Sequence, residues 1–185
     1  MFNLSSDLEQ LRVSERLSDF KLKVGDKEFP VHKAILAARS IVFAAMFESN
    51  MTENRQNEVK VTDIEATIIS DLLQYMYTGR IPPMSCEKAI SLYSASDKYS
   101  LEELKGKCVE FMIANLSVSN VCVVSTLADY HMDDKLKAAI NVFMRQHASE
   151  VVQSKQWKMF VRSKPHLATE ILESVVVDDC WEALL

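Results

Sequence analysis

The chain has 185 residues, 48% of them hydrophobic, and a formal net charge of −5. This composition supports a folded core and excludes a disordered chain, while the acidic balance argues against nucleic acid as a partner. The apolar run 31–47 carries Arg39 and Ser40 at its centre and is shorter than the roughly 20 apolar residues of a membrane-spanning helix. The N-terminus lacks the basic and apolar regions of a signal peptide. We therefore expect a soluble, intracellular protein with no membrane partner.

Catalytic and metal-binding motifs are missing from the sequence. There is no GxGxxG, GxxxxGK[ST], GxSxG or HExxH pattern, and the four histidines stand far apart. The cysteines show no CxxC spacing and are expected to be reduced thiols, with Cys108 and Cys122 in the core. The sequence therefore predicts a protein that is not an enzyme and that uses no metal and no cofactor.

A β-hairpin is predicted near the N-terminus. Apolar residues alternate with lysines over 20–24, Gly25 and Asp26 form a turn, and the alternation resumes over 28–31. The stretch 57–63, "NEVKVTD", alternates in the same way and predicts another short strand.

Two helices are expected on either side of this hairpin. Leu4, Leu8 and Leu11 recur at helical spacing and form one apolar face, which could dock on its own domain or on a second copy. The apolar run from Lys33 to Phe47 predicts one buried helix. His32, at the corner where the strand enters this helix, is expected to be a partly buried imidazole bonded to backbone, rather than a ligand or a base.

Everything after Asp63 is predicted to be helical. Gly79 stands just past the end of the first of these helices, and Pro165 marks the end of another. The N-caps expected from the sequence are Asp63, Ser85, Ser100 in a capping box with Glu103, Ser117 or Ser119, and Asp133. Cap and turn residues concentrate in "NLSVSN", so we expect a domain boundary near Asn115.

Several spaced motifs resemble the BTB/POZ domain family. They are Asp19 before the first strand, Phe29, His32 and Lys33 at the corner, Leu36 to Ser40, and Tyr77 to Gly79. The resemblance implies an α+β protein with the BTB/POZ fold, a small sheet flanked by helices, followed by an all-helical BACK-like region.

The segments "DKYSLEELKGKCVEFM", "NLSVSN", "HASEVV" and "KPHLATE" narrow the resemblance to the speckle-type POZ, or MATH–BTB, family. This implies a BTB/POZ domain with an N-terminal dimerisation helix over 1–115, a three-box or BACK-like helical region over 116–177, and a tail over 178–185. The MATH domain and the basic nuclear tail of that family have no counterpart in this sequence. We therefore expect the protein in the nucleus or the cytoplasm.

The resemblance implies two self-association surfaces. The residues that it assigns to a two-fold homodimer interface are Leu4, Leu8, Leu11 and Ile35. The residues that it assigns to a second dimer contact are Leu167, Ile171 and Leu172, the last of which stands where the family has a tyrosine.

It also implies two sites for other proteins. Asp19 and Lys33 match a charged pocket that lines the dimer groove and receives corepressor in transcription-factor relatives, although a buried ion pair with a structural role is the simpler interpretation. Met51, Thr52 and Glu53 match a hydrophobic-x-Glu motif that binds cullin-3 in adaptor relatives.

The implied function is that of a substrate adaptor in a cullin-3 RING ubiquitin ligase, which dimerises and binds the N-terminal region of cullin-3. One alternative is a BTB transcriptional regulator that recruits corepressor. Another is a partner without a MATH domain that forms heterodimers with related BTB adaptors. All three are protein-binding functions.

Overall fold

The computed structural model describes residues 3–48 and 56–182, and side-chain burial up to residue 175. The chain divides into two compact units, residues 1–108 and 109–185. The division falls inside helix α7 (Glu102–Ala114), a few residues before the boundary expected near Asn115. Each unit has its own core and is described by itself.

The first unit contains a three-stranded sheet in the order β2-β1-β3. The predicted hairpin is confirmed: β1 (Phe20–Val24) pairs antiparallel with β2 (Lys27–Val31). Gly25 has a φ of +58° in the turn between them, where glycine avoids the cost that a Cβ would bring. The predicted third strand, β3 (Glu58–Val61), is also confirmed and pairs parallel with β1. The alternating side chains of β1 fill the core with Phe20, Leu22 and Val24.

The apolar run after the hairpin forms two helices, so the prediction of one continuous helix was wrong. Helix α2 (Lys33–Arg39) ends at Ser40, which is extended at φ −140° and ψ 120°, and α3 (Ile41–Glu48) follows directly. The Ser40 hydroxyl accepts from the backbone N–H of Phe43 at 3.2 Å and donates to the carbonyl of Tyr99 at 2.6 Å. Ser40 therefore caps α3 and ties its start to the chain after α6.

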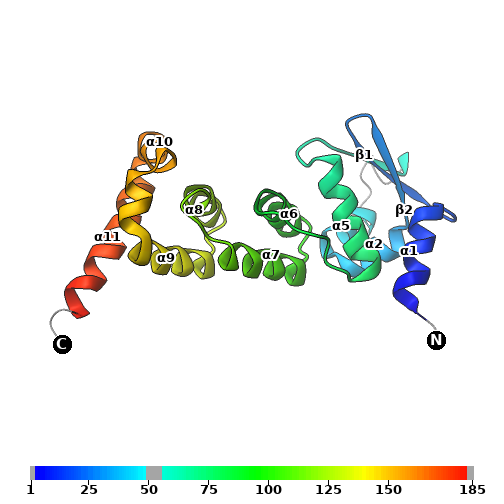
Figure 1. Ribbon diagram of the computed structural model, residues 1–185. Coiled ribbons are helices and arrows are strands. Elements are labelled where there is room, and N and C mark those ends of the chain that lie inside the picture. The colour runs from blue at the N-terminus through cyan, green and yellow to red at the C-terminus, as the bar shows by residue number, and fades with distance from the viewer. Residues whose placement is uncertain (1–2, 49–55, 183–185) are drawn as a thin grey trace. The chain divides into compact units, whose positions relative to one another are not determined.

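Helices flank the sheet of this unit (Figure 1). Helix α1 (Leu4–Ser14) and α2 both pack against α5 (Ala66–Thr78), and α5 also contacts α6 (Cys86–Lys98). Two predicted caps are confirmed. The Ser85 hydroxyl accepts from the N–H of Lys88, and Gly79 ends α5 with a φ of +69°.

Two other predicted caps, at Asp63 and at Ser100 with Glu103, were wrong, and the carboxylates of Asp63 and Glu103 have distant partners instead. Helix α5 begins at Ala66, and Asp63 instead pairs with Lys98 at 2.7 Å. Helix α7 begins at Glu102, and Ser100 has a φ of +53°, outside the extended conformation typical of an N-cap. The Glu103 carboxylate accepts from the Tyr75 hydroxyl at 2.9 Å. A tertiary contact thus replaces the expected local bond of Asp63 and that of Glu103.

The second unit is helical. Helices α8 (Val121–Tyr130), α10 (Lys155–Ser163) and α11 (Pro165–Glu182) pack around α9 (Asp134–Gln153). The predicted cap of α9 is confirmed, because the Asp133 carboxylate accepts from the N–H of Leu136. Helix α8 instead starts after Asn120, whose side chain accepts from the N–H of Ser117, so neither expected serine caps it.

The predicted core cysteines are confirmed. Cys108 and Cys122 are buried, and burial raises the pKa of both thiols, that of Cys108 to about 12. Among the described residues, no cluster of His, Cys, Asp or Glu could hold a metal ion. No helix in the described ranges is both long enough and apolar enough to cross a membrane.

The Ser40 cap gives a prediction about folding stability. Ser40→Ala leaves the buried N–H of Phe43 and the carbonyl of Tyr99 without this partner, so we expect the free energy of unfolding to fall by about 1–3 kcal/mol. Denaturant unfolding measures the loss. Ser91→Ala, on the exposed side of α6, is the matched control and should change stability by less than about 0.5 kcal/mol. Equal stabilities of the two variants would contradict the capping role.

Candidate interaction surfaces

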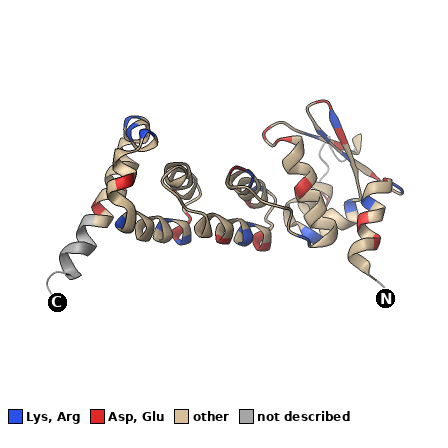
Figure 2. Ribbon diagram, in the orientation of Figure 1, with Lys and Arg blue, Asp and Glu red and all other residues tan. Residues whose placement is uncertain are grey.

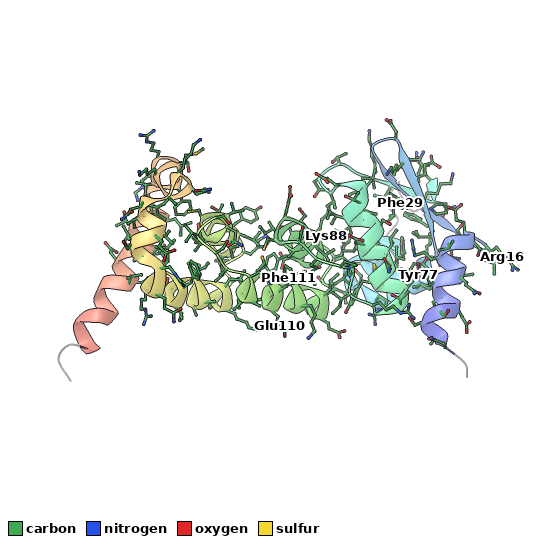
Figure 3. The ribbon with its side chains drawn as sticks, viewed as in Figure 1. Arg16, Phe29, Tyr77, Lys88, Glu110 and Phe111 are labelled. Atoms are coloured by element: carbon green, nitrogen blue, oxygen red, sulfur yellow. The ribbon has the colours of Figure 1, made fainter. Side chains whose placement is uncertain are left out.

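A buried histidine–tyrosine contact joins three elements of the first unit. His32 is 8% exposed, and its backbone N–H donates to the Tyr77 hydroxyl at 3.0 Å. Its Nδ1 lies 2.7 Å from the same hydroxyl, and its Nε2 lies 2.7 Å from the carbonyl oxygen of Arg16. Figure 3 shows Tyr77 on α5 and Arg16 just beyond the C-terminal end of α1. The prediction of a partly buried imidazole bonded to backbone is confirmed.

The partners of His32 determine which ring nitrogen carries the proton. A carbonyl oxygen only accepts, so Nε2 is the protonated nitrogen and Nδ1 accepts from the Tyr77 hydroxyl. Burial raises the pKa of Tyr77, which keeps this hydroxyl a donor. Every polar atom of the imidazole is thereby used in structure, which leaves none for binding a ligand.

Helix α1 presents the leucines assigned to the homodimer interface. Its register against α5 is held by the Ser5 hydroxyl, which donates to the carbonyl of Thr78 at 2.9 Å. No residue of α1 is buried: Leu4 is 71% exposed, and Leu8 and Leu11 are half-buried. Ile35, on α2, is also half-buried. Docking on its own domain thus covers only part of this apolar face.

Further exposed apolar side chains in this unit were not singled out from the sequence. Val13 is 67% exposed, Leu17 is 84% exposed and Ile41 is 75% exposed. Leu17 also has a φ of +61°, a strained conformation for a leucine. An apolar run in a sequence predicts buried core. Here the run breaks at Ser40, and Ile41, the first residue of α3, faces solvent.

The expected charged pocket is an exposed corner. The Asp19 carboxylate accepts from the backbone N–H of Lys33 at 2.8 Å, and the Lys33 ammonium donates to the Asn57 side chain at 2.8 Å. Asp19 is exposed and lies at the N-terminal end of α2, where the helix dipole favours a carboxylate. The structure brings the two residues together through the backbone of Lys33.

The residues expected to bind cullin-3, Met51, Thr52 and Glu53, lie outside the described residues. The flanking elements are α3, which ends at Glu48, and β3, which begins at Glu58.

The expected second dimer contact is largely internal. Leu167 is 9% exposed and Ile171 is 6% exposed, and both line a small hollow in the second unit together with Ile140. Leu172 lies on another side of α11 and is 37% exposed. Of the three predicted residues, Leu172 is the one that the second unit presents to solvent.

Comparison with known proteins agrees with this architecture. The family model "BTB/POZ domain" matches residues 8–116. A mouse protein, "TD and POZ domain-containing protein 1-like", is 38% identical over 178 residues, which cover 96% of this chain and 49% of the relative. The chain thus spans about half the length of that relative. The solved BTB domain of zebrafish PATZ1 is 28% identical with a TM-score of 0.51, and the match covers 58% of this chain and 86% of that domain.

The Tyr77 hydroxyl should stabilise the first unit measurably. Tyr77→Phe removes the hydroxyl that donates to Nδ1 of His32 and accepts from the backbone N–H of His32. We therefore expect the free energy of unfolding to fall by about 1–3 kcal/mol. The control is Tyr130→Phe, because Tyr130 is 81% exposed. Thermal or denaturant unfolding should separate the two variants. A neutral Tyr77→Phe would show that the hydroxyl is dispensable.

Proposed function

Because this chain belongs to the BTB/POZ domain family, we propose that it is the adaptor portion of a cullin-3 RING ubiquitin ligase, dimerising and binding the N-terminal region of cullin-3. BTB/POZ domains mediate dimerisation and protein–protein interaction, and proteins of this family are in general non-catalytic interaction modules. In this role the chain brings partners together and catalyses nothing itself.

The observation that carries the adaptor proposal is the helical unit that follows the BTB/POZ match. Residues 109–185 form a compact unit with a core of their own. The resemblance to the speckle-type POZ family implies that such a region, over 116–177 and followed by a tail over 178–185, is a BACK-like module whose three-box supports cullin binding. The mouse relative also matches over 96% of this chain, which includes this region.

Dimerisation is supported by the apolar side chains that the first unit leaves in water. Leu4 and Ile41 are 71% and 75% exposed, on α1 and α3, and Leu8, Leu11 and Ile35 are half covered. Fully burying a leucine contributes about 1.5–3 kcal/mol. A second copy that presents the same surface across a two-fold axis would bury these residues reciprocally.

A transcriptional regulator is the second candidate function. It is favoured by the exposed position of Asp19 beside Lys33, where a corepressor peptide would find an accessible carboxylate. Heterodimers with related BTB adaptors would use the same α1 surface as homodimers. Affinity for cullin-3 separates the adaptor from the regulator.

The dimer proposal predicts a change of oligomeric state. Replacing Leu4, Leu8 and Leu11 by Asp puts three charges into the proposed interface, where each would be costly to bury, so light scattering should report a monomer. The control replaces Val123 and Val142 by Asp, since both are at least half exposed on the second unit, and should remain a dimer. A monomeric wild-type chain at tens of micromolar would overturn the proposal.

The cullin proposal predicts a loss of affinity at Met51. A flexible thioether adapts to an irregular apolar pocket, so Met51→Ala should weaken binding to the cullin-3 N-terminal region by about 1–3 kcal/mol in titration calorimetry. Glu53→Lys should weaken it less, and mostly at low salt, because salt screens exposed charges.

The matched control for Met51 is Met84→Ala, a half-buried methionine of the first unit just before α6. It should leave cullin affinity unchanged, and neither loop variant should alter the dimer. Unchanged affinity in a folded Met51→Ala would remove the loop from the interface and favour the regulator.

A further inference from the structure

Helix α10 of the second unit has an apolar inner face and a basic outer face. Trp157 and Phe160 are each 5% exposed and hold the helix against its own unit. Three cations and one methionine face the other way, at spacings that place them on one side of a helix. This surface, the basic face of α10, consists of Lys155, Lys158, Met159 and Arg162.

The cations of this face have no acidic partner. Within the described part of the chain, Lys155, Lys158 and Arg162 make no ion pair and no side-chain hydrogen bond, whereas Lys98 pairs with Asp63 at 2.7 Å. The sequence contains no Asp or Glu from 151 to 169. Figure 2 shows α10 carrying basic and no acidic colour. In a chain whose net charge is −5, this is a local concentration of uncompensated positive charge.

The chemistry around the charges favours a protein partner over a membrane or a nucleic acid. A helix that lies in a membrane surface buries a broad apolar face in lipid, but α10 has turned that face inward with Trp157 and Phe160. Nucleic-acid affinity grows with the number of phosphates that are neutralised, and three cations in an acidic chain offer few. Met159 lies among these cations and is 61% exposed, so it offers a partner one apolar side chain to contact.

The spacing of the cations defines the partner further. Residues 155 and 162 lie about 10 Å apart along the helix axis at 1.5 Å per residue. Carboxylates at positions i, i+3 and i+7 of a facing helix span the same length, about 10 Å. We propose that the basic face of α10 is a docking surface for an acidic segment of another protein that carries an apolar residue among its carboxylates. This surface shares no residue with those assigned above to the two dimer contacts or with Met51, Thr52 and Glu53.

Fluorescence anisotropy with the full chain tests this surface directly. The probe is a labelled synthetic helical peptide with Glu at positions i, i+3 and i+7 and a leucine between them. The test variant replaces Lys155, Lys158 and Arg162 by Gln. The control variant replaces Lys27, Lys60 and Lys135 by Gln, which removes the same charge from other exposed positions.

We expect wild type and control to bind the peptide alike and the test variant to bind it about ten-fold more weakly, an effect that added salt reduces. Since all the replaced side chains face solvent, unfolding curves should coincide. Equal binding by the two variants, or equal binding of a peptide with Gln in place of Glu, would overturn the proposal. Phosphatidylserine vesicles and duplex DNA are run in parallel. The proposal would also be overturned if the test variant bound the vesicles or the DNA more weakly than wild type and the control do, but bound the peptide equally well.

Discussion

The Tyr77 hydroxyl is the contact on which the arrangement of the first unit depends. It accepts from the backbone N–H of His32 and lies 2.7 Å from Nδ1 of the same residue, while Nε2 of His32 reaches the carbonyl of Arg16. Through the buried His32, this contact joins α5, the corner between β2 and α2, and the chain that leaves α1. Without it, the backbone N–H and the Nδ1 of His32 would lose their partner together, and such networks are costly to leave half satisfied.

This corner also determines what the unit presents to solvent. It fixes the C-terminal side of α1, and the bond from Ser5 to Thr78 fixes the N-terminal side. With α1 held at both ends against α5, Leu4 remains in water. The break at Ser40 does the same for Ile41 on α3. Polar hydrogen bonds therefore hold apolar side chains at the surface, which is what a stable association surface needs.

The sequence predicted the local features well and the tertiary partners poorly. The hairpin and the caps at Ser85 and Asp133 were predictable because their signals lie within a few residues. The expected cap at Asp63 failed because Lys98, 35 residues away, holds that carboxylate. The break at Ser40 was missed because its partner is the distant carbonyl of Tyr99. In the candidate site, the role of His32 followed from its position, but its partner Tyr77 did not.

The α1 face and the basic face of α10 differ in the force that would hold a partner, and this difference has a functional consequence. The α1 face is apolar, so association through it depends on burial of area and is little affected by salt. The basic face of α10 offers a partner only exposed charges and one methionine. Binding there would be modest in energy and sensitive to screening by salt. If both proposals hold, the chain binds a second copy through α1 and exchanges acidic segments at α10. At the proposed α10 surface, charge would set how fast such segments arrive, and Met159 would favour those with an apolar residue at the matching position.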